Sequence, residues 1–207
     1  MRWFGLALLV AACNDETSPR WQLRHDRIIA VRATPPGILA GETTELDAFV
    51  TDGAGGTAVV LPVSIVVDPA FATVDGNRIT ARDSLAGPIS LRAELTVPVG
   101  ERTYAATKSI LVGARATNPA IGRVTLEGEV VGPAIAVPID TSLELAVEAP
   151  ATSGTNWLTS CGSLAADDEA ISSLTVASED PQSGELALVI RQDEGVAWVT
   201  WSLTTAR

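Results

Sequence analysis

Few residues in this 207-residue chain have the chemistry of a nucleophile, a general base or a metal ligand. There is one histidine, His25, and there are two cysteines, Cys13 and Cys161. Nucleophilic catalysis needs a base beside the nucleophile in a formed pocket, whereas His25 precedes the first predicted strand, where a solvent-exposed side chain is expected. A zinc site needs several Cys or His ligands, so the sequence predicts no metal site and no cofactor.

Acidic residues gather in three short clusters, at 167–169, 179–180 and 193–194. None of the clusters has the spacing of a calcium loop, and neighbouring carboxylates on a strand point to opposite faces. Solvated loops are the favoured interpretation, and a calcium site is the alternative. Because no nucleophile, base and pocket come together, the sequence predicts a protein that is not an enzyme.

The N-terminus carries the clearest chemical signal. One positive charge is followed by an apolar run too short to cross a bilayer, and small residues then precede Cys13. The sequence Val-Ala-Ala-Cys at 10–13 resembles the lipobox of bacterial lipoproteins. This resemblance implies a signal peptide over 1–12 and diacylglycerol on the Cys13 thiol, which would anchor the chain in the cell envelope on the periplasmic or outer-surface side of a membrane. An ordinary signal peptide is the alternative.

Residues 13–23 are then expected to form a polar tether that lifts the folded part off the lipid. The formal net charge of −11 disfavours binding to nucleic acid or to anionic lipid headgroups. The expected partners are therefore membrane lipid, reached through acylated Cys13, and an envelope protein.

From about residue 24 onward, short apolar patterns separated by turn residues predict an all-β chain. The alternation from Ile89 to Leu95 predicts a strand with one buried and one exposed face. Segment 113–119 lacks a pattern and ends in Asn-Pro, which indicates a boundary. Strands are expected at 27–33, 44–50, 59–67, 71–74, 78–81, 89–97 and 103–112 before it, and at 121–127, 134–137, 143–147, 157–161, 171–176, 186–191 and 196–203 after it.

Two stretches carry a further family resemblance. Residues 33–36, Ala-Thr-Pro-Pro, together with the Gly-Glu-Thr turn at 41–43, resemble strands A and B of bacterial immunoglobulin-like domains. Segments 157–162 and 191–198 are similar to the C strand and the F–G hairpin of such domains. The resemblance implies two tandem immunoglobulin-like β-sandwiches, at 24–113 and 119–207. A single β domain is the alternative, and the chain lacks the cysteine pair of antibody domains.

Trp157 and Cys161 lie four residues apart on a predicted strand, so they share a face. In this fold a tryptophan on strand C belongs to the core, and we expect both side chains to be buried. With Cys13 acylated, Cys161 is the only remaining thiol, so no intramolecular disulfide is expected.

Trp198 is the candidate for a contact with a partner protein. If residues 192–195 form the F–G turn, the ladder pairs Leu186 with Trp201 on the core face and leaves Trp198 and Arg191 on the outer face. Arg191 would then cover the Trp198 ring by a cation–π contact, or the ring would be an exposed anchor for a partner.

The leading hypothesis is a membrane-anchored envelope lipoprotein that acts as a non-enzymatic binding or spacer module. The alternative is a structural subunit of a multi-protein cell-envelope assembly. The β-sandwich alone does not choose between them, because it serves many functions.

Overall fold

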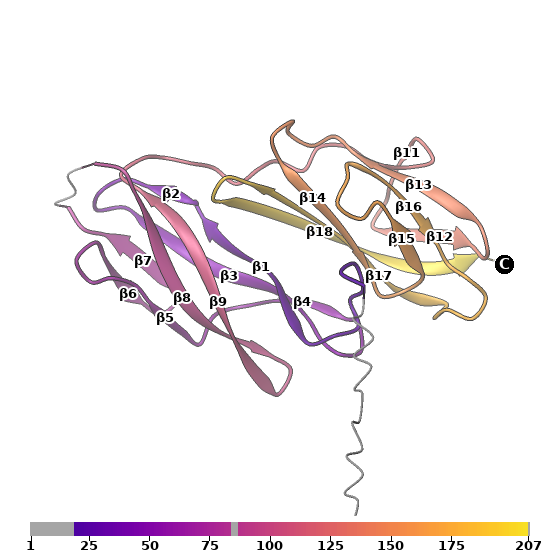
Figure 1. Cartoon of the computed structure of the whole chain (residues 1–207), viewed down its shortest axis with the longest axis horizontal. Coiled ribbons are helices and arrows are strands. Elements are labelled where there is room, and N and C mark those ends of the chain that lie inside the picture. Colours follow the sequence, from indigo (N-terminus) through magenta and orange to yellow (C-terminus); the bar gives the residue numbers. More distant parts are fainter. Residues whose placement is uncertain (1–18, 84–86, 207) are drawn as a thin grey trace, which may run out of the picture.

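The computed structural model describes residues 19–83 and 87–206 (Figure 1). Every regular element in these two ranges is a β-strand. No helix in the described ranges is long and apolar enough to cross a membrane. The predicted signal peptide and Cys13 lie outside the described residues.

The first nine strands form two sheets that face each other. One sheet has the order β1-β3-β7-β6, with β4 also paired to β3, and the other has the order β2-β9-β8-β5. This is the A-B-E-D and A′-G-F-C arrangement of an immunoglobulin-like sandwich. The strands are β1 Arg27–Thr34, β2 Gly37–Ile38, β3 Thr43–Thr51, β4 Thr57–Val60, β5 Ser64–Val66, β6 Ala72–Asp75, β7 Arg78–Ala81, β8 Ile89–Val99 and β9 Arg102–Val112.

The remaining nine strands repeat this plan. One sheet has the order β11-β10-β13-β16-β15, and the other has the order β12-β18-β17-β14, with β12 parallel to β18 as β2 is to β9. The predicted tandem of immunoglobulin-like β-sandwiches is therefore confirmed. The strands are β10 Val124–Leu126, β11 Glu129–Val130, β12 Ala134–Pro138, β13 Ser142–Val147, β14 Gly154–Thr159, β15 Ser163–Ala165, β16 Ile171–Thr175, β17 Ser183–Gln192 and β18 Gly195–Ala206.

Each predicted strand has a counterpart, but the strand expected at 59–67 is two strands. The chain leaves β4 in one sheet and enters β5 in the other, with the buried Pro62 between them. Proline has no N–H to donate to a sheet ladder, so it suits this crossing. Three short strands, β2, β11 and β15, were not predicted, because runs of two or three residues leave no readable periodicity.

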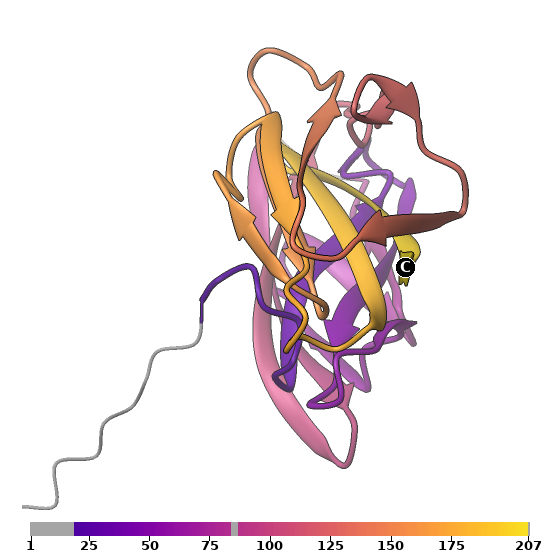
Figure 2. The ribbon, with the colours of Figure 1, turned by 90° about the vertical axis from the view of Figure 1, so that its right-hand side faces the viewer.

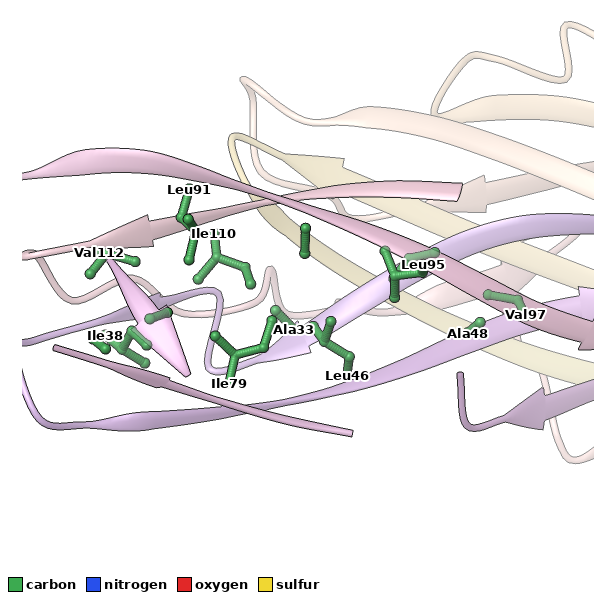
Figure 3. Packing of buried hydrophobic residues seen from close by; sticks show 14 of the residues in the cluster. Ala33, Ile38, Leu46, Ala48, Ile79, Leu91, Leu95, Val97, Ile110 and Val112 are labelled. Carbon is green, nitrogen blue, oxygen red and sulfur yellow. The ribbon is translucent and has the colours of Figure 1, made fainter. Parts of the chain in front are cut away.

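Each sandwich has its own hydrophobic core. In the first, Leu91, Ala93 and Leu95 of β8 are 3%, 0% and 3% exposed, and this confirms the predicted alternation. Figure 3 shows Leu91 and Leu95 on one side of this core, with Leu46 and Ile79 of the facing sheet on the other. In the second, Trp157 and Cys161 are fully buried and belong to one cluster, as predicted.

The two sandwiches lie one after the other along the longest axis of the molecule (Figure 1). In the view of Figure 2 the second sandwich stands in front of the first. Strand β18 begins beside the first sandwich and ends at the far end of the second, so its first residues lie at the junction of the two.

Candidate functional site

The register of the β17–β18 hairpin decides where the candidate partner-binding residues lie. Leu186 pairs with Trp201, Ile190 with Ala197, and the turn closes between Gln192 and Gly195. The predicted register is therefore confirmed. Trp201 faces the core and stacks on Trp157, with ring centroids 6.4 Å apart.

The opposite face of this hairpin packs against the first sandwich instead of facing solvent. Side chains from β14, β17 and β18 meet side chains from β1 and β3 in a third hydrophobic cluster. We call it the junction core. Its members are Leu23, Ile29, Ala30, Phe49, Leu158, Ala187, Val189, Val196 and Trp198.

Trp198 contacts two residues of the first sandwich. Its ring stacks on Phe49, with centroids 5.3 Å apart and planes 9° from parallel. Arg32 is on β1, and its guanidinium lies 4.0 Å from the centroid of the Trp198 ring. The same guanidinium forms an ion pair with Asp47. The prediction that Arg191 covers this ring is therefore wrong, and the face predicted to be open is occupied by the chain's own first sandwich.

Arg191 instead makes one hydrogen bond within the second sandwich and one to the first. Its Nη1 donates to Oδ1 of Asn156, and its Nη2 donates to the carbonyl oxygen of Ile29 at 2.8 Å. The ladder between β1 and β3 shifts register between Ile28 and Ala30. Ile29 therefore has no paired residue on β3. Burial lowers the pKa of Arg191, because desolvation disfavours its charged form.

Asn118, in the segment predicted as a boundary, fixes the angle between the sandwiches. Its Nδ2 donates to the carbonyl oxygen of Ala33 at 2.8 Å, and its Oδ1 accepts from the N–H of Val196 at 2.9 Å. Thr57 also donates to the carboxylate of Glu185 across the junction. Together with the junction core, these bonds hold the two sandwiches against each other, whereas domains on a flexible linker share few contacts.

Residues 20–23 were predicted to belong to the tether, and the structure corrects this. The N–H of Leu23 donates to the carbonyl oxygen of Thr159 at 2.9 Å, and the N–H of Thr159 donates to that of Trp21 at 2.8 Å. The Leu23 side chain is 0% exposed and lies in the junction core. A polar composition predicts a loose chain, but Trp21 and Leu23 are apolar, and burying them offsets the entropy cost of ordering the segment.

His25 and Cys161 are placed as the sequence predicts. His25 is exposed, with Nε2 3.4 Å from Oε1 of Gln22. Cys161 is buried, and its Sγ donates to the carbonyl oxygen of Pro181. Desolvation raises the pKa of the Cys161 thiol, Asp180 adds to the effect, and Arg24 opposes it. Among the described residues, no three acidic, Cys or His side chains come together as metal ligands would.

One edge of the first sandwich exposes apolar side chains. Val59, Leu61, Val63 and Val66 are 54%, 58%, 64% and 61% exposed, along the segment that carries β4 and β5. No charged residue occurs between 57 and 67. Strand β5 is at the end of its sheet, so this side is an apolar strand edge.

No protein-family model and no curated protein sequence matches the chain. Among solved structures, a chimeric titin Z1Z2 carrying a peptide from decorin is 18% identical, over 87% of this chain and 99% of that one, with a TM-score of 0.29. The N-terminal Ig1-2 module of the Drosophila receptor protein tyrosine phosphatase DLAR is 13% identical, over 88% and 99%, with a TM-score of 0.37. Domains 4 and 5 of the S-layer protein SbsC are 10% identical, over 87% and 100%, with a TM-score of 0.27. The fold assignment rests on the strand order of this chain.

Proposed function

We propose that this protein is a cell-envelope lipoprotein, anchored by acyl chains on Cys13, whose two fused sandwiches form a rigid, non-enzymatic binding module beside the membrane. Two or more acyl chains give stable anchoring, since each buried methylene contributes about 0.8 kcal/mol. The module would lie on the periplasmic or outer-surface side of that membrane.

The docking of residues 21–23 between the sandwiches is the observation that carries this proposal. Five residues lie between Cys13 and Pro19. The Cα atoms of Cys13 and Pro19 are therefore six chain steps apart, which span at most about 22 Å when fully extended. The described chain begins beside the junction of the sandwiches, at the indigo segment below β17 in Figure 1. An anchor at Cys13 would therefore hold the molecule near the junction, with both sandwiches close to the lipid. This placement suits a binding module better than a spacer that reaches away from the membrane.

Substitution of the anchor residue tests the proposal. Cys13→Ser should move the protein from the membrane fraction to the soluble fraction, and a clickable palmitate analogue should label the wild type only. Cys161→Ser is the matched control and should stay membrane-bound and labelled. Equal labelling of wild type and Cys13→Ser would refute the anchor.

The apolar edge of the first sandwich favours a second candidate, a structural subunit of a multi-protein envelope assembly. A free β-strand edge with apolar side chains is suited to pairing with a strand of another subunit. Val63→Lys with Val66→Lys would place charges on that edge. If the chain is a subunit, companions that co-purify with the wild type in mild detergent should be lost from this variant. A wild type that purifies alone would reject the subunit function.

A further inference from the structure

A pocket of about 360 Å³ lies at the junction of the sandwiches, beside Arg191. Three arginines line it, Arg20, Arg27 and Arg191, and Asp167 is the only acidic residue in the lining. The chain as a whole has 25 acidic and 14 basic residues. A pocket with three cationic side chains and one anionic side chain therefore runs against the overall charge of the protein.

Ion pairing within the protein does not account for this charge. The four ion pairs among the described residues use other arginines, namely Arg32, Arg78, Arg92 and Arg115. Arg27 donates from Nη2 to the carbonyl oxygens of Arg20 and Gln22, at 2.8 Å each. Arg191 likewise bonds neutral acceptors, on Asn156 and Ile29. These acceptors orient the two guanidiniums but do not neutralise them.

The positive charge is also partly withdrawn from water. Burial lowers the pKa of both Arg27 and Arg191, because desolvation disfavours a charged guanidinium. The Nε atom of Arg27 is buried, and it has no hydrogen-bond partner in the described part of the chain. Oriented, desolvated and uncompensated guanidiniums are the arrangement with which proteins bind carboxylates and phosphates.

We propose that this pocket binds a small organic anion, whose carboxylate or phosphate group lies against Arg20, Arg27 and Arg191. Ile28 and Ile29 line the same pocket and would contact the apolar part of the ligand. The volume is at the lower end of the range for small-molecule sites, so the ligand is compact. The site is built by β1, β14 and β17, and it therefore exists only where the two sandwiches meet. It does not depend on the anchor at Cys13.

Calorimetric titration with phenyl phosphate tests the proposal, with the purified full chain in a neutral detergent. We expect one site per chain, a dissociation constant on the order of 1 mM or tighter at low ionic strength, and weaker binding in salt. Arg20→Gln should weaken binding at least about fivefold. The Arg20 side chain is exposed and donates no hydrogen bond within the described residues, so its loss should not disturb the fold.

Arg102→Gln is the matched control, since it removes the same charge from an exposed position at the β8–β9 turn. Its affinity should change less than about twofold, as expected for a remote exposed charge. The NMR signal of the Arg27 Nε–H should shift on titration in the wild type and in Arg102→Gln. Absence of saturable binding, or equal weakening in both variants, would overturn the proposal. Binding to mixed micelles that contain phosphatidylglycerol, without binding of phenyl phosphate, would also overturn it in favour of a lipid headgroup.

Discussion

Trp198 of the second sandwich and Phe49 of the first stack across the junction with nearly parallel rings, whose centroids are 5.3 Å apart. Such pairs contribute about 0.5–1.5 kcal/mol beyond the area that they bury. A double-mutant cycle with Trp198→Ala and Phe49→Ala, with the free energy of unfolding of each variant summed over both sandwiches, should therefore give a coupling free energy in this range. Urea unfolding, followed by circular dichroism, measures it. A coupling near zero would mean that the rings do not stabilise each other.

Trp198→Ala should also separate the unfolding of the two sandwiches. The ring is half-buried at the junction, whereas Trp201 belongs to the core of the second sandwich. Trp201→Ala should lower the stability of that sandwich by about 3–5 kcal/mol, and Trp198→Ala should cost less but broaden the transition into two. One sharp transition in Trp198→Ala would show that the other junction contacts suffice for cooperativity.

Gly55 fits against Ser160 of the second sandwich. A Cβ added to Gly55 would lie 2.6 Å from the Cβ of Ser160, and the φ angle of Gly55 is +91°. Gly76 also has a positive φ, +59°, but a Cβ there would meet nothing within 4 Å. Gly76→Ala should cost about 1–2 kcal/mol from backbone strain alone. Gly55→Ala should lower the free energy of unfolding by about 1–3 kcal/mol more than Gly76→Ala, because the added methyl group overpacks the junction. Chemical denaturation of the two variants measures this difference.

Trp157 is the largest fully buried side chain among residues 19–83 and 87–206, and its indole Nε1 donates to the carbonyl oxygen of Glu169 at 3.0 Å. Trp157→Ala should lower the free energy of unfolding by about 3–5 kcal/mol. Trp157→Phe keeps most of the packing but leaves the Glu169 carbonyl without its donor. Its cost should be smaller, about 1–3 kcal/mol. A small loss in the alanine variant would contradict the observed burial.

Cys161 should make stability depend on pH in the alkaline range. Burial raises its pKa above the ordinary value of 9.0, so the unfolded state loses the thiol proton first. The stability that this group contributes is complete below pH 9.0 and decreases as the pH rises toward the folded-state pKa. Cys161→Ala should lose less stability than the wild type between pH 8 and 10.

The same burial predicts slow chemistry at the Cys161 thiol. Ellman's reagent should label it only after denaturation, because the side chain is 0% exposed. Rapid labelling of the native protein would show that the second sandwich opens near Pro181.

The sequence determined the features that depend on neighbours along the chain. Strand periodicity placed Leu91, Ala93 and Leu95 on one face, and the turn at 192–195 set the register that carries Trp201 into the core. A two-residue side-chain period and a short turn leave little freedom in register, so local residues suffice to predict both.

The tertiary structure alone decided what covers the outer face of that hairpin. The register put Trp198 on this face, but Phe49 and Arg32, which cover it, come from strands far away in the sequence. One feature of the sequence indicates a second layer. The run Leu186–Ile190 is apolar at every position, whereas a strand with one exposed face would alternate apolar and polar residues. All five residues are buried in the structure. The run indicates that both faces are covered but not by what. The contacts of Trp198 with Phe49 and Arg32, and the arginine-lined pocket, form only when the two sandwiches pack against each other. They join residues that are far apart in the sequence, so local sequence patterns do not predict them.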